Sequence, residues 1–389
     1  MLREEYMSNF YKCIRPKYLR DFQCDGKACG SKCCGDWRIT IDPETISKYN
    51  NMEPKEEGRE ILSHIIYRKQ YQSFGISLQK DYRCPFLDSD YLCKIQKRYG
   101  EEFISDICAT YPRMFYLVGD MMEESLAVTC PLAAKKVLLS GTDIGFEEVE
   151  LPFPRKTQII DWTRHVEAFS DCWRQIQETC IRVLQDKNFS MDARFLRLLV
   201  ILDKLDRFEV DAIPEWIENA ESTGFSSLDM PETAFNPDKH VEYMAKLFDK
   251  LYGMSLTAQK LVAIQYIYRE KMDTLLADIL EKYAVPLENY GVNEFFLRFF
   301  PFAFTGPLLY NGKIFVISYK LAELSMLLTA VSKGGKLEEE DFLQMVDRIS
   351  ERLDHSRDGM TFVRDSIGEE PLSQNVADFA EYMLNTGGK

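Results

Sequence analysis

Cysteine is concentrated in one third of this 389-residue chain, and that concentration constrains the fold more than any other feature. Eight of the eleven cysteines lie between residues 24 and 130, where they share the sequence with short apolar runs and turn signals. Thiolates at short spacings are the soft ligands that zinc and iron–sulfur clusters require. We therefore predict that metal is bound by eight residues: Cys24, Cys29, Cys33, Cys34, Cys84, Cys93, Cys108 and Cys130.

The spacing of these cysteines favours an iron–sulfur cluster, with zinc as the alternative metal. The paired C-x2-C knuckles typical of zinc sites are missing, and the chain has only four scattered histidines. Cys33 and Cys34 are adjacent, so their side chains diverge. They serve two centres, or one is a ligand and the other a neighbouring thiol, or one or both are buried as small apolar residues. Cys13, Cys172 and Cys180 fall outside the set, and the latter two are spaced like one packed helix face.

Composition predicts a soluble, cytoplasmic protein. The N-terminus is charged and lacks the apolar region of a secretory signal. The most hydrophobic stretch, 295–303, is too short to cross a bilayer. In a reducing cytosol, clustered cysteines favour metal over disulfides. The net charge of −14 argues against nucleic acid as a partner, because a phosphate backbone requires a basic surface.

The pattern of the first 145 residues predicts a cysteine-rich metal-binding domain with few short strands. Strands are expected at 37–41 and 125–128, and helices at 53–72, 101–108 and 131–139. Asp42-Pro43 has the form of an N-cap followed by an N1 proline, which predicts a helix over 44–49. Glycines, acidic residues and prolines over 141–154 predict a linker.

The remainder, 146–389, is predicted to be an α-helical domain, so the fold class expected for the whole chain is mainly α. Amphipathic or apolar helices are expected at 157–186, 192–208, 241–251, 256–284, 289–304 and 314–331. A loop is expected at 222–239, and a turn at Asn311-Gly312.

Several cofactor motifs are absent from the sequence. It has no G-x-G-x-x-G, P-loop, H-E-x-x-H or nucleophile elbow. The C-x3-C-x2-C triad of radical S-adenosylmethionine enzymes is also missing, because Cys34 directly follows Cys33. A conventional nucleotide-cofactor enzyme is therefore not expected.

Residues 11–140 resemble the bacterial flagellin lysine-N-methylases, a branch of a larger cysteine-rich group described as zinc- or iron-chelating. The matching stretches are Arg15-Pro16-Lys17-Tyr18, Phe22-Gln23-Cys24-Asp25-Gly26, Ala28-Cys29, Cys33-Cys34-Gly35-Asp36-Trp37, Ile41-Asp42, Cys84-Pro85-Phe86-Leu87, Leu92-Cys93-Lys94-Ile95-Gln96, Tyr111-Pro112-Arg113 and Cys130-Pro131. The helical remainder matches the family in character only. Two positions depart from the family pattern: Leu132 stands where the family usually has Glu, and Asp36 replaces a glycine.

The resemblance implies methyl transfer from S-adenosylmethionine to surface lysines of flagellin, with a protein-bound [4Fe-4S] cluster. An open iron of such a cluster is one candidate for chelating the amino-acid part of the cofactor. We predict as further cofactor contacts Arg113, through the cofactor carboxylate, and Trp37 and Tyr111, through stacking. Core packing around the cysteines is the alternative role for these side chains. The alternative function is a non-catalytic zinc- or iron–sulfur-binding protein that transfers electrons or docks a partner.

Overall fold

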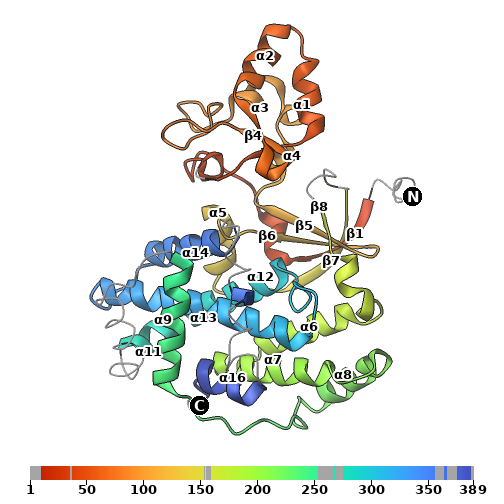
Figure 1. Ribbon diagram of the computed structural model, residues 1–389, viewed down its shortest axis with the longest axis vertical. Helices are drawn as coiled ribbons and strands as arrows, with labels where there is room; N and C mark the ends of the chain where they lie inside the picture. Colours follow the sequence, from red (N-terminus) through yellow and green to blue (C-terminus); the bar gives the residue numbers. More distant parts are fainter. Residues whose placement is uncertain are drawn as a thin grey trace. The chain divides into compact units, whose positions relative to one another are not determined.

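The computed structural model describes residues 10–35, 37–152, 154, 159–252, 267, 275–354, 363–365 and 375–386. The chain forms two compact units. Unit 1 comprises 1–136 and 145–161, and unit 2 comprises 137–144 and 162–389. The mainly α fold class, with a cysteine-rich region followed by helices, is confirmed (Figure 1). The sequence placed one boundary at residue 145, whereas the strands that follow it belong to unit 1.

Unit 1 contains a five-stranded mixed sheet in the order β7-β1-β6-β5-β8. Its strands are β1 (Phe10–Pro16), β5 (Arg113–Val118), β6 (Met121–Leu126), β7 (Phe146–Pro152) and β8 (Ile159–Asp161). A tight hairpin joins β5 to β6, because Gly119 adopts the positive φ of 64° that such a turn requires. The predicted linker at 141–154 is wrong for 146–152, since β7 pairs along the whole length of β1.

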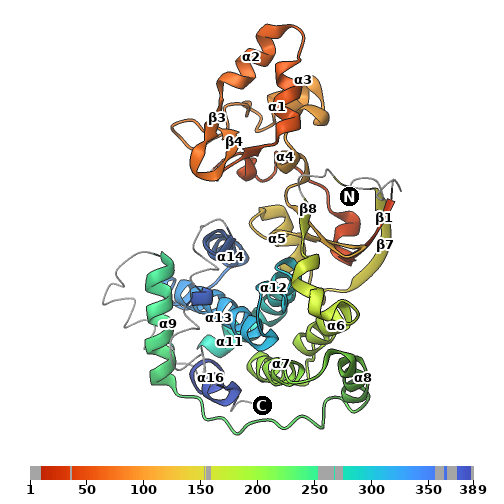
Figure 2. The same ribbon diagram turned by 45° about the vertical axis from the view of Figure 1, so that its right-hand side comes forward.

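The cysteine-rich part of unit 1 combines a small antiparallel sheet with short helices (Figure 2). The sheet has the order β2-β4-β3, formed by β2 (Thr40–Ile41), β3 (Ile65–Arg68) and β4 (Ser73–Ile76). The helices are α1 (Pro43–Asn50), α2 (Lys55–Ser63), α3 (Lys94–Tyr99), α4 (Asp106–Thr110) and, at the edge of the unit, α5 (Pro131–Leu138). The helix predicted at 53–72 is wrong beyond Ser63, because residues 65–68 pair with β4 instead.

The predicted helix start at Asp42-Pro43 is confirmed. The Asp42 carboxylate accepts hydrogen bonds from the Thr45 backbone N–H at 2.7 Å and the Thr45 hydroxyl at 2.9 Å. It also accepts one from the Asp106 N–H at 3.1 Å, which ties the start of α4 to the start of α1. One N-cap residue therefore positions two helices of the cysteine-rich core.

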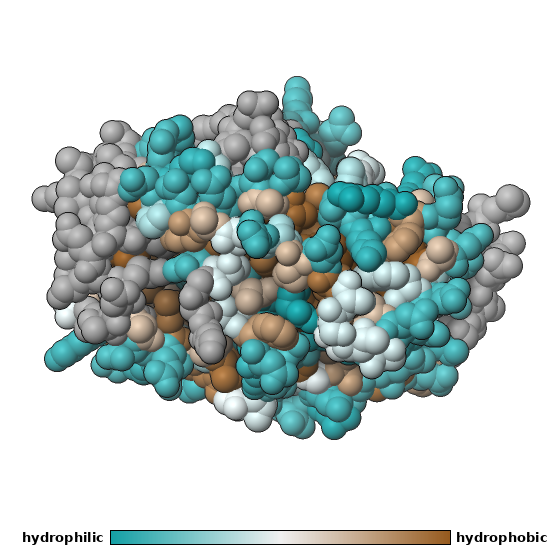
Figure 3. All heavy atoms as spheres, turned by 90° about the horizontal axis from the view of Figure 1, so that it is seen from below, coloured by the Kyte–Doolittle hydropathy of each residue, from teal (hydrophilic) through white to brown (hydrophobic). Residues whose placement is uncertain are grey.

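Unit 2 is a helical bundle built around α13 (Leu308–Ser332), which packs against α7 (Met191–Leu205) and α14 (Glu339–Asp354). The other described helices of eight or more residues are α6 (Trp173–Leu184), α8 (Ile213–Ser222), α9 (Pro237–Tyr252), α11 (Leu275–Lys282), α12 (Ala284–Leu297) and α16 (Val376–Met383). The predicted helix at 256–284 lies mostly outside the described residues, and α11 confirms its last part. Seen from below, hydrophilic residues alternate with apolar patches on the coloured surface (Figure 3).

The turn predicted at Asn311-Gly312 is wrong, because both residues lie inside α13. The Asn311 side chain bonds to both the N–H and the C=O of Phe304, which fastens the preceding loop to the helix. A Cβ at Gly312 would lie 2.5 Å from a Leu202 methyl of α7. The glycine therefore serves close helix packing rather than a turn.

By length and composition, α13 is the one helix in the described part of the chain that is apolar enough to cross a membrane. Its 18-residue apolar window is 83% buried inside the structure. Helices that are apolar all round are typical of the centre of a large bundle, and the packing of α7 and α14 against α13 accounts for its composition.

Candidate functional site

The first cysteines lie in a loop between η1 (Lys17–Asp21) and η2 (Lys32–Cys34) that folds back on itself. The Ser31 N–H donates to the Gly26 carbonyl at 2.9 Å, and the Ser31 hydroxyl bonds to the Gly26 and Tyr91 carbonyls. Positive φ values at Gly30 and Ser31 make this reversal possible. The loop thereby returns Cys33 towards the segment that follows Tyr91.

Backbone pairing brings the later cysteines to the same place. The Cys84 N–H donates to the Cys34 carbonyl at 2.7 Å, and a β-bridge joins Leu87 to Cys93. Cys108 lies on α4, whose first N–H group, that of Asp106, donates a hydrogen bond to the Asp42 carboxylate. We refer to Cys33, Cys34, Cys84, Cys93 and Cys108 as the thiol cluster. Of these, Cys84 belongs to one apolar core, and Cys34 and Cys93 pack against it.

The thiols of this cluster influence one another electrostatically. Burial raises the pKa of Cys84 to about 11, and the charges of Cys93 and Cys33 raise it as well. Desolvation, followed by the charges of Cys93, Cys84 and Cys33, also raises the pKa of Cys108, which lies at an exposed position. A hydrogen bond from Cys34 lowers the pKa of Cys33, whereas the same contact raises the pKa of Cys34.

Cys24, Cys29 and Cys130 form a second group. Burial raises the pKa of Cys130 to about 11, and the charges of Cys29 and Cys24 add to this effect. Cys33 connects the two groups. Burial is the largest cause of the raised pKa of Cys24, and the charge of Cys33 is the next. Each of the eight predicted metal ligands therefore lies close enough to another of the eight for the charge of one thiolate to shift the pKa of the other.

The donor chemistry of these eight residues fits a thiolate-bound metal. All eleven cysteines lie in the described chain, and none forms a disulfide. Burial, followed by the charges of neighbouring thiolates, raises the pKa of several of these thiols, and a bound cation would favour their thiolate forms. Among the described residues, however, no three Cys, His, Asp or Glu side chains converge tightly enough to hold a metal ion. Which cysteines are direct ligands therefore stays a prediction.

The three predicted cofactor contacts lie beside the cysteines. The Trp37 indole donates to the Cys33 carbonyl at 2.7 Å, and its ring centroid is 5.6 Å from that of Tyr111. Arg113 donates to the Phe22 carbonyl at 3.0 Å and pairs with Glu124 at 3.3 Å. Arg113 thus already has protein partners, and its predicted role at a cofactor remains untested. Asp36 lies outside the described residues.

The cysteines left out of the predicted set are part of packed cores. Cys13 is fully buried in β1, and Cys180 is fully buried in α6. Cys172 is 2% exposed at the start of the same helix. The predicted packed face of Cys172 and Cys180 is confirmed.

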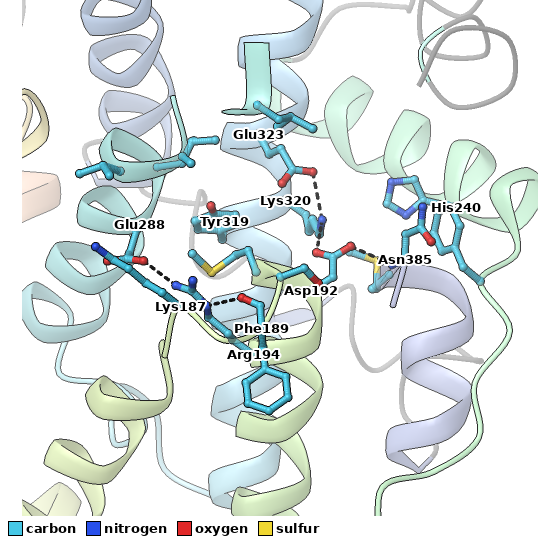
Figure 4. A pocket seen from close by; sticks show the side chains of 18 residues that line it. Lys187, Phe189, Asp192, Arg194, His240, Glu288, Tyr319, Lys320, Glu323 and Asn385 are labelled. Atoms are coloured by element: carbon cyan, nitrogen blue, oxygen red, sulfur yellow. Dashed lines mark hydrogen bonds and ion pairs between the residues drawn. The ribbon is translucent and has the colours of Figure 1, made fainter. Parts of the chain in front are cut away.

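A cavity of about 490 Å³ lies wholly within unit 2. It is lined by α7, α11, α12 and α13, together with His240 of α9 and the end of α16 (Figure 4). Its apolar wall includes Phe189, Phe235 and Leu280. A volume of this size with mostly apolar walls and a few charged groups is typical of small-molecule sites.

Two buried groups of ion pairs face this cavity (Figure 4). In one, Arg194 bonds to Glu288 at 2.5 Å, and its guanidinium also donates to the Phe189 and Leu184 carbonyls. In the other, Lys320 lies 2.5 Å from Asp192 and 3.0 Å from Glu323. With Lys187, which also lines the cavity and pairs with Asp143, the lining contains three cations and three carboxylates.

Desolvation shapes the chemistry of the cavity. Burial raises the pKa of Glu288 and Glu323, although Arg194 and Lys320 respectively oppose the shift. Burial also raises the pKa of the Tyr319 hydroxyl, and the charges of both ion-pair groups act on it. Burial followed by the Lys320 charge lowers the pKa of His240 to about 3, so this imidazole is neutral at pH 7. The cavity therefore presents a neutral histidine and a neutral tyrosine between charged groups.

The sequence alone did not reveal these cavity residues. One signal was available: Lys320 and Glu323 interrupt the apolar stretch predicted as a helix over 314–331. Charged residues inside an otherwise apolar helix require buried partners. Lys320 and Glu323 pair with each other, but the other partner of Lys320, Asp192, is far away in the sequence, so only the fold identifies it.

Comparison with known protein families shows to which family the chain belongs. The family model "FliB lysine N-methylase C-terminal domain" matches residues 177–377, just over half of the chain and most of unit 2. The chain belongs to the FliB lysine N-methylase family. A second family model, "Putative zinc- or iron-chelating domain", matches residues 23–131, which contain all eight predicted ligands. The FliB-domain match includes most of the residues that line the cavity.

Curated relatives agree with this family. Lysine-N-methylases of Salmonella choleraesuis and Salmonella typhimurium are each 26% identical over 196 residues, which is 50% of this chain and 47% of each relative. The flagellar biosynthetic protein FliU of Salmonella muenchen is 28% identical over 163 residues, 41% of this chain and 95% of that protein. The matched region thus spans about half the length of the curated lysine-N-methylases. No solved structure matches the chain.

Proposed function

We propose that this protein is a lysine N-methyltransferase that uses S-adenosylmethionine to methylate lysine side chains of flagellin. The observation that carries the proposal is the FliB lysine N-methylase domain over 177–377. The cavity of unit 2 supports it, because an open cavity of small-molecule size lies in that same region. The FliU name of one relative supports a flagellar substrate.

The proposed reaction needs an unprotonated lysine amine. The nitrogen lone pair forms a bond to the methyl carbon of the sulfonium, the carbon–sulfur bond breaks, and its electron pair stays on sulfur. The substituted amine then loses one proton to solvent or to a base. A donor with a methyl sulfonium therefore supplies an activated methyl group, and the protein has to orient and desolvate the two reactants.

We further propose that the cysteines of unit 1 hold an iron–sulfur cluster, [4Fe-4S] in type, with zinc as the alternative. The candidate ligands are the thiol cluster together with Cys24, Cys29 and Cys130. Their mutual effects on pKa support a shared cation. Such a centre would link the 24–34 loop, the segment around Cys84, the start of α3, α4 and the residue before α5, and would thereby stabilise unit 1.

The test is methyl transfer in vitro. The full chain, purified anaerobically with its metal content measured, is incubated with isotopically labelled S-adenosylmethionine and flagellin from the same organism. Peptide mass spectrometry should locate the label on flagellin lysines. Flagellin whose lysines were chemically dimethylated beforehand is the matched control and should acquire no label.

A protein that retains its metal and binds the methyl donor, yet labels no flagellin lysine, would refute the proposed substrate. Label on lysines of another surface protein would retain the methylase and replace its substrate. The thiol cluster supports one other function, that of a non-catalytic metal-binding or electron-transfer protein. Metal retention with no binding of the methyl donor would favour it.

A further inference from the structure

The small sheet of the cysteine-rich part ends on β3, whose outer edge pairs with no other strand of the described chain. Figure 2 shows β3 beside β4, its one partner in that sheet. The Ser77 N–H donates to the His64 carbonyl at 2.8 Å, so the alternate residues 66 and 68 also bond towards β4. The N–H and C=O groups of Ile65 and Tyr67 therefore point to the outer edge, where they bond to no other described residue.

The side chains in the middle of this strand are apolar and exposed. Ile66 is 41% and Tyr67 is 53% exposed, although the two lie on opposite faces of the strand. Tyr71, in the short helix η3 (Lys69–Tyr71) that follows, is exposed as well. Of the nine exposed large hydrophobic residues in the described chain, six lie between residues 66 and 92. An exposed apolar edge strand is a template for pairing with another chain.

Three cations beside this edge have no carboxylate partner among the described residues. Arg68 ends β3, Lys69 follows it, and the Arg38 guanidinium lies 3.9 Å from the centre of the Tyr71 ring. None of the three forms an ion pair within the described ranges, whereas Lys97 of the same part pairs with a carboxylate at 2.6 Å. The whole chain has a net charge of −14, so this local positive charge indicates a partner with carboxylates.

The strand is also held in an extended shape before any partner arrives. Ile65 and Phe74 pack against the core that contains Cys84. The ring of Phe74 lies edge to face with that of Tyr67, with the centroids 5.1 Å apart. A partner strand would therefore meet a preorganised edge, which lowers the ordering cost of binding.

We infer that the outer edge of β3 binds an extended, acidic segment of the protein substrate, flagellin, as a further strand of this sheet. The outward backbone groups of Ile65 and Tyr67 bond to the segment, and the three unpaired cations bind its carboxylates. The exposed side chains of Ile66 and Tyr67 contact its apolar residues. The inference rests on the proposed methyltransferase function and adds how the enzyme holds its substrate at a distance from the target lysine.

Charge argues against a second copy of this chain as the occupant. Two copies paired through β3 would bring the same unpaired cations, Arg68 and Lys69, close to their counterparts. Like charges on neighbouring strands destabilise the pairing. An acidic segment replaces that repulsion with attraction.

The test is the binding of fluorescently labelled flagellin to the full, metal-replete protein, measured by anisotropy. Tyr67→Ser and Lys69→Glu should each raise the dissociation constant by about fivefold or more, because one removes an apolar contact and the other reverses a charge. Phe10→Ser is the matched control for the first, since Phe10 is 55% exposed on β1 of the same unit. Lys135→Glu, at an exposed position of α5, is the control for the second. Each control should change the dissociation constant by less than about twofold.

Methylation kinetics give a second readout. A contact remote from the reacting lysine stabilises the bound substrate and the transition state equally. Both β3 variants should therefore raise KM for flagellin and leave kcat unchanged. Their metal content and far-ultraviolet circular dichroism should match those of the wild type, so that misfolding does not imitate the loss of binding.

Competing peptides test the chemistry of the segment. A peptide of about nine residues in which valine alternates with glutamate has one apolar and one acidic face as a strand, and it should displace flagellin. The same peptide with lysine in place of glutamate should not. Equal displacement by both peptides would overturn the inference, because the cations would then have no part in recognition.

The remaining outcomes separate the inference from the function on which it rests. Flagellin binding that both β3 variants leave unchanged would overturn the inference, while methyl transfer by the wild type would still support the methyltransferase. If Tyr67→Ser abolishes self-association in sedimentation and leaves flagellin binding intact, the edge pairs two copies of the chain and the inference fails. If flagellin binds in a Tyr67-dependent way but receives no methyl group, the docking edge stands and the methyltransferase proposal fails.

Discussion

Gly58 of α2 offers a sharp test of how the cysteine-rich core is packed. A Cβ at this position would lie 2.1 Å from the carbonyl oxygen of Tyr49 and 3.3 Å from the Cβ of Met52. The first contact is with backbone at the end of α1, so no side-chain rotation can relieve it. The helices α1 and α2 would have to separate by about 1 Å to restore an ordinary carbon–oxygen distance.

The expected effect of Gly58→Ala is a balance of two terms. Alanine favours a helix interior over glycine by about 0.5–1 kcal/mol. Overpacking of a buried contact costs about 1–3 kcal/mol or more, and here Tyr49 and Met52 are both buried in the core that also contains Cys84. Because the obstacle is backbone, we expect the second term to win, with a net loss of about 2 kcal/mol in local stability.

Hydrogen exchange followed by mass spectrometry measures this loss in unit 1 alone. Peptides from 43–63 should exchange roughly 30-fold faster in Gly58→Ala than in wild type, if exchange follows the opening equilibrium. Glu60→Ala, at an exposed position of the same helix, is the control and should leave the rates nearly unchanged. Equal or slower exchange in Gly58→Ala would refute the close α1–α2 contact.

Three other changes test the site and the fold. Cys84→Ala should remove most of the bound metal, measured by elemental analysis, whereas Cys172→Ala, in the core of unit 2, should retain it; metal retained in both would remove Cys84 from the ligand set. Burial lowers the pKa of Lys313 to about 8. In wild type, the buried charge of Lys313 therefore destabilises the fold fully below that pH, and this destabilisation disappears as pH rises towards the pKa of lysine in the unfolded chain. Lys313→Met should therefore be more stable than wild type by about 1–3 kcal/mol at pH 7 in urea unfolding, and an advantage that does not shrink by pH 10 would contradict this reasoning. Asp42→Ala should cost about 1–2 kcal/mol at pH 7 through the lost caps of α1 and α4. Burial raises the pKa of Asp42, but the hydrogen bonds from Thr45 and Asp106 outweigh it, so the pKa is lowered in the folded state. The stability that Asp42 contributes is therefore present above its pKa in the unfolded chain and is lost as pH falls through its pKa in the folded chain. A stability difference between Asp42→Ala and wild type that stays constant into acid would refute this reasoning.

Local sequence signals predicted those elements whose partners are close in the chain. The helix after Asp42-Pro43, the helix from Pro131 and the loop between α8 and α9 depend on capping, periodicity and turn residues over a few positions. The prediction for 146–152 failed because the pairing partner of this segment, β1, is distant in the sequence. The prediction for Asn311-Gly312 failed because Gly312 lies inside α13 and packs against α7. The helix predicted over 53–72 failed at 65–68 for a local reason, since these residues pair with the neighbouring strand β4.

The candidate metal ligands could be predicted because cysteine is rare and its clustering has few chemical explanations. The cavity could not, since it is assembled from side chains of common type. Arg194 and Glu288 are ordinary charged residues in the sequence, and their meaning comes from being buried together. A buried ion pair requires two specific groups at one place, and no periodicity within either helix specifies that place.

The sequence by itself thus determined the cysteine-rich first half, the helical second half and the resemblance to the lysine-N-methylases, because composition, spacing and local propensity are properties of the chain. The tertiary structure decided which helices surround the unit 2 cavity and which charged side chains pair beside it. The burial and desolvation of these groups arise when segments far apart in the sequence pack together, as those of Asp192 and Lys320 do. The charges and pKa values of that cavity therefore exist only in the folded chain.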